Sequence, residues 1–115
     1  MRVTLYHNPR CSKSRQALEL LRRRGIEPEI IEYLEHPPTK ALLRKLLHML
    51  GIGPRELLRK GEAAYKSGKL GDPSRSDGEL IDAMIEHPVL IERPIAVAGR
   101  RAVVGRPPER VLEIL

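Results

Sequence analysis

The first 33 residues carry a strand, a helix and a second strand in succession, and this order constrains the fold more than any other feature of the chain. Polar and apolar residues alternate over residues 2–6, which predicts a short strand. Apolar spacing predicts a helix from Cys11 or Ser12 to Arg24, and residues 29–33 predict the second strand. A strand, helix and strand of this length favour a right-handed crossover, so we expect the two strands to be parallel.

The middle of the chain, about residues 39–87, is predicted to be an entirely helical insert. Thr39 is a suitable N-cap for a first helix with leucines at helical spacing, and a shorter helix is expected to begin at Pro54. Ser76 begins a capping-box pattern ahead of another helix. Residues 67–75 between these helices are rich in Gly, Ser and Pro, which predicts a polar loop.

After the insert, residues 95–98 and 101–104 predict two strands of a β-hairpin around a tight turn. Pro107 and Pro108 then open a last helix, because proline is tolerated in the first helical turn. The sum is an α/β thioredoxin-like, three-layer fold: a mixed four-stranded sheet with a helical insertion after its second strand. We expect residues 1–115 to form a single domain.

The composition of the chain argues against some classes of partner. The chain has no Phe, no Trp and only three Tyr, so the stacking platforms on which single-stranded nucleic acids are bound are scarce. Most of its 21 basic residues are Arg, and the net charge is +6, which favours an anionic partner of the oxyanion or carboxylate class, or a surface kept soluble by its charge. No apolar run is long enough for a membrane span. We therefore expect neither a nucleic-acid nor a membrane partner.

Cys11 is the only cysteine, so the chain has no internal disulfide, and a reducing cytoplasm suits it best. It follows the first predicted strand at the beginning of a helix, where unpaired backbone N–H groups and the helix dipole lower the pKa of a thiol. Arg10, Lys13 and Arg15 add positive charge nearby in sequence. The alternative is an inert thiol that packs as a small apolar side chain.

The segment from Cys11 to Ser14 is a Cys-x-x-Ser motif, a dithiol motif that lacks its second sulfur. Any redox cycle therefore needs a thiol from outside the chain to release what Cys11 forms. A Cys-x5-Arg phosphatase loop is excluded, because the position that needs Arg holds Ala17. We predict no metal site, since the remaining histidines lack ligand spacing with acidic partners: His36, His48 and His87.

Residues 7–15, His-Asn-Pro-Arg-Cys-Ser-Lys-Ser-Arg, resemble the His-x3-Cys-x3-Arg loop of the glutathione- and glutaredoxin-dependent arsenate reductase (ArsC) family. Four later segments are similar to that family's later blocks in the same order: residues 33–39, 55–60, 88–95 and 105–109. The resemblance thus covers essentially the whole chain and is much more specific than the cysteine loop alone.

The resemblance implies a role for each matching residue. Cys11 is the nucleophile, and Arg59, Arg93 and Arg106 match three oxyanion-binding arginines. Three guanidinium groups suit arsenate, a tetrahedral dianion near neutral pH, because each offers a planar fork of donors. The fold commonly places a cis proline beside its catalytic cysteine, so we predict that the Arg93–Pro94 bond is cis and faces Cys11.

Supporting roles follow for four residues of the loop. His7 matches the family histidine that tunes the cysteine, although a histidine at a strand end can also bond only to its neighbours. Asn8 is interpreted as an organiser of the loop, and Ser14 can donate a hydroxyl hydrogen bond toward the thiol. Arg15 is expected either on the helix surface or in a structural ion pair.

The implied reaction is the reduction of arsenate, or a similar oxyanion, through a thiol–arsenate ester on Cys11. Glutathione is the implied co-substrate and glutaredoxin the protein partner, with no bound cofactor. A monomer is expected. Two alternatives remain: a thiol oxidoreductase acting on glutathionylated proteins, or a regulatory binding module like the Spx-type transcription regulators of the same family. Ser14 argues against the second, because the Cys-x-x-Cys switch of those regulators needs its second sulfur.

Overall fold

The computed structural model describes residues 2–115. The chain divides into two compact units. Unit 1 holds the chain up to His36 and from Arg93 to Leu115, and unit 2 is the segment Pro37–Glu92 between them. The helical insert expected over about residues 39–87 falls inside unit 2. That residues 1–115 act as a single domain stays a prediction.

Unit 1 contains the sheet. Its elements are β1 (Val3–His7), α1 (Ser12–Arg23), β2 (Glu29–Glu32), β3 (Ile95–Ala98), β4 (Arg101–Val104) and the 3-10 helix η2 (Pro108–Ile114). The strand order is β2-β1-β3-β4. β1 is parallel to β2 and antiparallel to β3, and β3 is antiparallel to β4. The mixed four-stranded sheet, its parallel pair and its hairpin are therefore confirmed.

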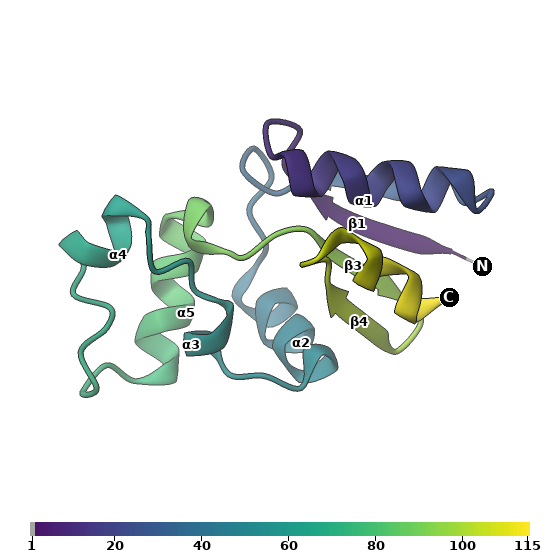
Figure 1. The fold of residues 1–115 in the computed structure, drawn as a ribbon. Coiled ribbons are helices and arrows are strands. Elements are labelled where there is room, and N and C mark those ends of the chain that lie inside the picture. The colour runs from purple at the N-terminus through teal and green to yellow at the C-terminus, as the bar shows by residue number, and fades with distance from the viewer. Residues whose placement is uncertain (1) are drawn as a thin grey trace. The chain divides into compact units, whose positions relative to one another are not determined.

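The core of unit 1 lies on one face of this sheet. In Figure 1, α1 runs alongside β1, and the C-terminal segment lies against β3 and β4. The buried cluster is made only of aliphatic side chains: Val3, Leu5, Ala17, Leu21, Ala96, Ala98, Val103, Val111 and Ile114. Alternate residues of the strands point to this face, as the period of a strand requires. The packing of α1 and β1 in unit 1 therefore fixes the position of the short loop that joins them.

Unit 2 is helical. Its elements are α2 (Lys40–Leu50), α3 (Pro54–Leu57), α4 (Ala63–Ser67), α5 (Asp77–Glu86) and the 3-10 helix η1 (Pro88–Leu90). The predicted caps are present: Thr39 Oγ1 accepts from Leu42 N at 3.1 Å, and Ser76 Oγ accepts from Glu79 N at 3.2 Å. α5 packs against α2, α3 and η1 through buried apolar side chains.

Two helical details differ from the sequence prediction. α4 was not expected, because its five residues have no side-chain cap and no buried residue. The last helix is a 3-10 helix, in which Val111 and Ile114 are buried and Leu115 is partly buried. Short segments of this kind take their conformation from packing rather than from their own propensity.

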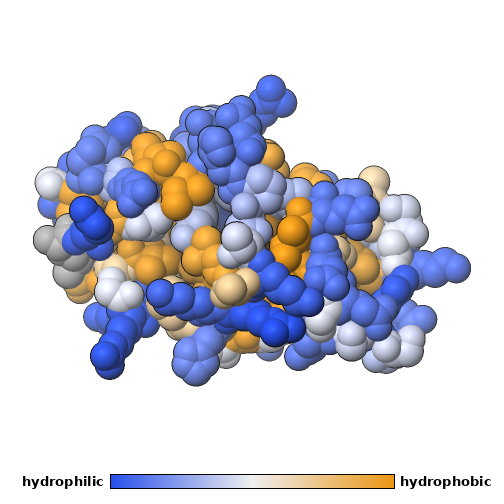
Figure 2. Space-filling model, turned by 180° about the vertical axis from the view of Figure 1, so that it is seen from behind, coloured by the Kyte–Doolittle hydropathy of each residue, from blue (hydrophilic) through white to orange (hydrophobic). Residues whose placement is uncertain are grey.

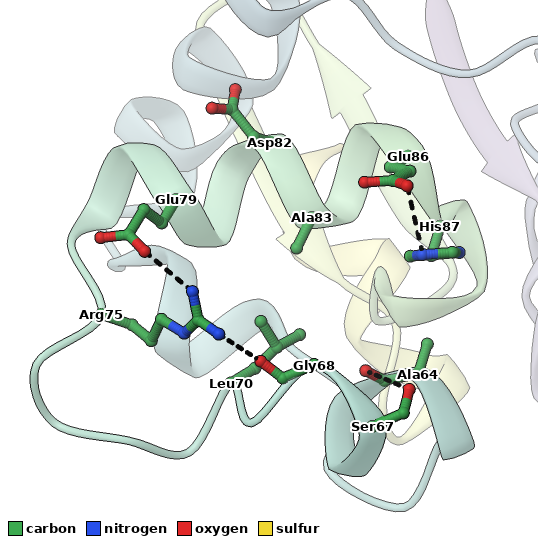
Figure 3. Close-up of a pocket in the computed structure, with 10 residues that line it drawn as sticks. All are labelled: Ala64, Ser67, Gly68, Leu70, Arg75, Glu79, Asp82, Ala83, Glu86 and His87. Atoms are coloured by element: carbon green, nitrogen blue, oxygen red, sulfur yellow. Dashed lines mark hydrogen bonds and ion pairs between the residues drawn. The ribbon is translucent and has the colours of Figure 1, made fainter.

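The polar loop after α4 is held in place by two arginines. Arg55 donates to the carbonyl oxygens of Leu70, Asp72 and Arg75 at 3.2, 2.9 and 2.8 Å. Arg75 in turn donates to Gly68 O at 2.7 Å and pairs with a carboxylate of α5 (Figure 3). The loop is therefore anchored to both α3 and α5.

The exterior carries few large apolar side chains. On the face drawn in Figure 2, hydrophilic residues surround separate patches of hydrophobic ones. Among the described residues, the exposed large apolar side chains are Ile30, Leu34 and Val89. Across residues 2–115, no helix has the length and apolar character needed to cross a bilayer.

Candidate active site

Cys11 lies directly after the β1–α1 loop and is the N-cap of α1, with extended backbone angles (φ −94°, ψ 123°). Its side chain is partly exposed. Burial alone would raise the pKa of the thiol. The backbone N–H groups of Ser14 and Lys13 and the guanidinium of Arg93 outweigh that effect, so the pKa of Cys11 is below its ordinary value. The first turn of a helix stabilises a thiolate because it offers N–H groups that have no partner inside the helix.

Arg93 supplies the positive charge at this sulfur, both by a side-chain hydrogen bond and by its charge. Lys13 and Arg15, which lie near Cys11 in sequence, do not supply this positive charge. Lys13 acts through its backbone N–H, and the Arg15 guanidinium donates to Pro9 O at 2.9 Å. The charge therefore comes from a residue far along the chain, at the start of the segment that leads into β3.

Arg106 lies close to Arg93. Its Nη1 donates to the carbonyl oxygen of Arg93 at 3.1 Å, so one guanidinium is tied to the backbone of the other arginine. The predicted cis bond at Arg93–Pro94 is confirmed, and the Arg106–Pro107 bond, for which no prediction was made, is also cis. The structure thus brings together in unit 1 the three residues Cys11, Arg93 and Arg106.

Gly105 joins these two arginine segments. Its N–H donates to Pro94 O at 2.8 Å. A Cβ at this position would lie 2.8 Å from Val111 Cγ1 and 2.9 Å from Pro94 Cγ, which is closer than carbon atoms pack. Only glycine fits here without moving Pro94 or Val111, so the close approach of the two segments depends on it.

Arg59 belongs to unit 2. The backbone N–H of Arg59 donates to Leu90 O at 2.8 Å, next to the β-bridge that pairs Leu58 with Ile91. The carboxylates of Glu62 and Glu92 lie 3.7 and 3.8 Å from its guanidinium. Its buried Nη1 is the atom that faces Glu62, and it forms no hydrogen bond within the part of the chain that the structure describes.

His7 and Ser14 form a buried pair behind the loop. They are 5% and 0% exposed, and His7 Nδ1 is hydrogen-bonded to Ser14 Oγ. Ser14 Oγ also accepts from Asn8 N at 3.1 Å, so the serine hydroxyl links the imidazole to the backbone of the loop. Burial lowers the pKa of His7 against the opposing charge of Glu32, which favours the neutral imidazole.

This pair revises the expectation for Ser14 and agrees with the alternative given for His7. The Ser14 hydroxyl binds the imidazole and the loop, and it is the backbone N–H of Ser14 that acts on the thiol. The histidine is hydrogen-bonded to its neighbour Ser14. A direct catalytic part for His7 stays a prediction.

Asn8 and Arg15 fix the path of the loop. Asn8 Oδ1 accepts from Arg10 N, and Asn8 O accepts from Cys11 N, both at 3.0 Å. Arg15 is exposed on the surface of α1, which is one of its two expected environments, and it donates to a backbone carbonyl. These bonds present the sulfur at the start of α1 in one orientation.

A cavity of about 220 Å³ adjoins this loop within unit 1. We call it the loop cavity, and it is lined by His7, Asn8, Pro9, Arg10, Glu32, Leu34 and Glu35. His7 and Glu32 are paired in register at the ends of the parallel strands β1 and β2. Ligand sites of open α/β sheets commonly lie at this end of the strands.

A second cavity of about 360 Å³ lies in unit 2, between residues 64 and 87 (Figure 3). Its lining has no cysteine, and its carboxylates have partners: Glu79 with Arg75, Asp82 with Lys40, and Glu86 with His87. Within the described residues, no three His, Cys, Asp or Glu side chains are grouped closely enough to hold a metal ion. Cys11 therefore remains the candidate nucleophile.

The comparisons with known proteins agree on one family. The family model described as "ArsC family" matches residues 6–114. A protein of Escherichia coli (strain K12) named "Uncharacterized protein YfgD" is 54% identical over 114 residues, covering 98% of this chain and 96% of that protein. The "Arsenate reductase" of Rhizobium meliloti (strain 1021) is 48% identical over 115 residues, covering 100% of this chain and 82% of that one.

Solved structures give the same result. The structure titled "Arsenate reductase from Vibrio cholerae" superposes with a TM-score of 0.98 and is 52% identical, covering 100% of this chain and 98% of that chain. The α/β fold with its mixed sheet is therefore shared with this group of thioredoxin-like proteins.

The electrostatics of Cys11 predict its reactivity toward iodoacetamide. Because the thiolate is the nucleophile and the pKa is lowered, the alkylation rate should reach half its maximum at a lower pH than for free cysteine. Arg93→Ala should move this midpoint upward, toward the ordinary value, since one stabilising charge is lost. Arg100→Ala, in the exposed β3–β4 turn, is the matched control. An Arg93→Ala midpoint equal to that of the wild type would contradict the assignment.

The close packing at Gly105 predicts a loss of stability. Gly105→Ala forces Pro94 or Val111 to move, at a cost of about 2 kcal/mol in the free energy of unfolding. Gly61→Ala, where a Cβ meets no atom within 4 Å, is the control. Urea unfolding of the two variants measures the difference, and equal midpoints would show that the Pro94 contact does not constrain this position.

Proposed function

Because this chain belongs to the ArsC family, whose model covers nearly all of it, we propose that it is an arsenate reductase that reduces arsenate to arsenite through Cys11. The observation that carries the proposal is the Arg93 guanidinium beside the Cys11 sulfur at the start of α1. The same group that favours the thiolate can bind an oxygen of a tetrahedral anion. Substrate and nucleophile are then held next to each other, which is the main requirement of this reaction.

The first step is attack of the Cys11 thiolate on arsenic. A sulfur–arsenic bond forms, and one arsenic–oxygen bond breaks, with its oxygen leaving as water. Arg93 and Arg106 neutralise the remaining oxygens from unit 1. Arg59 is proposed as the third oxyanion ligand, as the resemblance implies.

The second step is attack of a glutathione thiolate on the thiol–arsenate ester. Two electrons pass from the two sulfurs to arsenic, so As(V) becomes As(III) and leaves as arsenite, while Cys11 and glutathione become joined as a disulfide. Glutaredoxin then takes over the glutathione and regenerates the Cys11 thiolate. An outside thiol is necessary because the described chain offers no second cysteine. A glutathione-dependent cycle suits the reducing cytoplasm.

The test is arsenate-dependent oxidation of NADPH with glutathione, glutaredoxin and glutathione reductase. Cys11→Ser should abolish turnover, and Arg93→Ala should lower it about 100-fold, because a donor to the reacting anion is lost. Arg100→Ala should retain turnover. No turnover by the wild type, together with a low-pKa Cys11, would contradict the proposal and indicate a thiol enzyme with another substrate.

The same variants separate arsenate reduction from general thiol oxidoreductase activity. Arg59→Ala and Arg106→Ala should lose arsenate turnover but keep the deglutathionylation of a glutathionylated peptide, which needs only Cys11. Loss of both activities would indicate that these arginines hold the fold rather than the oxyanion.

A further inference from the structure

The loop cavity is lined by charged residues of both signs. Glu32 and Glu35 come from the end of β2 and the turn after it, and Arg10 comes from the β1–α1 loop. In the part of the chain that the structure describes, neither carboxylate forms an ion pair with Lys or Arg, although the protein carries a net charge of +6. Two carboxylates without cationic partners lie in a cavity next to the nucleophile's loop, in a chain rich in arginine.

His7 gives the cavity a buried polar group. It is 5% exposed and lines the cavity, and its Nδ1 is occupied by Ser14. The other ring nitrogen, Nε2, has no hydrogen bond to any described residue. It is therefore open to a polar group of a ligand in the cavity.

These groups match one chemical pattern, an ammonium and a carboxylate on the same small molecule. Glu32 and Glu35 suit an ammonium, whereas Arg10 suits a carboxylate. Arsenate does not fit, because the two carboxylates repel a dianion. Leu34, which is 40% exposed, adds an apolar surface for the aliphatic part of such a ligand.

We propose that the loop cavity binds the amino-acid end of the thiol co-substrate, which is the γ-glutamyl group when the thiol is glutathione. The proposal rests on the proposed function for the identity of the thiol. Arg10, on the wall of the cavity, directly precedes Cys11, and adjacent Cα atoms lie about 3.8 Å apart. A molecule anchored here thus lies next to the loop that carries Cys11, and we expect its thiol to reach the sulfur from there.

The direct test is the binding of S-methylglutathione, which cannot react, measured by calorimetry. The wild type should bind it, and the double variant Glu32→Gln with Glu35→Gln should bind it about tenfold more weakly, because the ammonium loses its counter-charges. Glu29→Gln, on the same strand but outside the cavity, is the matched control. Unchanged affinity in the double variant would overturn the proposal.

Kinetics give a second readout. In the double variant the KM for glutathione should rise about tenfold while the KM for arsenate holds, and turnover with 2-mercaptoethanol, which has no amino-acid end, should be unchanged. An equal loss with both thiols would overturn the proposal by showing a general structural effect. An unchanged rate of Cys11 alkylation verifies that the double variant retains its fold.

The two proposals fail separately. If the wild type does not turn over arsenate but binds S-methylglutathione through Glu32 and Glu35, the proposed function falls and the cavity assignment stands. If arsenate is turned over and the glutamate substitutions change neither binding nor the KM for glutathione, the cavity assignment falls and the function stands.

Discussion

The electrostatic balance at the Cys11 sulfur is the constraint on which the rest of unit 1 depends. Partial burial disfavours a negative charge there, and the first-turn N–H groups of α1 together with the Arg93 guanidinium reverse that preference. The N–H groups lie close to Cys11 in the sequence, whereas Arg93 lies far from it. The lowering of the Cys11 pKa by Arg93 therefore requires that β1, α1 and the segment ahead of β3 are assembled, so this part of the cysteine's reactivity is a property of the folded sheet.

The sheet order explains how the distant source reaches the sulfur. β3 pairs with β1 in antiparallel register, with Tyr6 opposite Ile95, so the residues before β3 lie beside the end of β1 from which the cysteine loop leaves. Gly105 then lets the chain after β4 approach Pro94, and Arg106 donates to the Arg93 carbonyl. The hairpin thus positions two guanidinium groups in one small region of unit 1. β2 is the other neighbour of β1, and its end and the turn after it supply the carboxylates of the loop cavity. The proposed oxyanion site is therefore positively charged, whereas the proposed site for the thiol co-substrate carries negative charge.

Much of the fold could be predicted because its signals are local. The caps at Thr39 and Ser76 and the alternation in the strands gave the long helices and the sheet correctly. α4 escaped prediction because it has neither cap nor buried residue. In the site, the oxyanion arginines came from a family resemblance, since nothing in the spacing of Arg93 relates it to Cys11. The direction of the Ser14 hydroxyl was predicted wrongly, because a serine at N3 of a helix can satisfy either the thiol or a buried imidazole, and only packing decides.

The central claim is that an oxyanion binds directly beside the Cys11 thiolate. Sulfate, an unreactive tetrahedral dianion, tests it through linkage, because a bound dianion must raise the pKa of a neighbouring thiol. The measurement is the titration of thiolate absorbance against pH with and without sulfate, at constant ionic strength set by chloride. The account predicts that sulfate raises the pKa of Cys11 in the wild type but not in Arg106→Ala. A pKa unaffected by saturating sulfate in the wild type would show that the anion does not lie next to the sulfur.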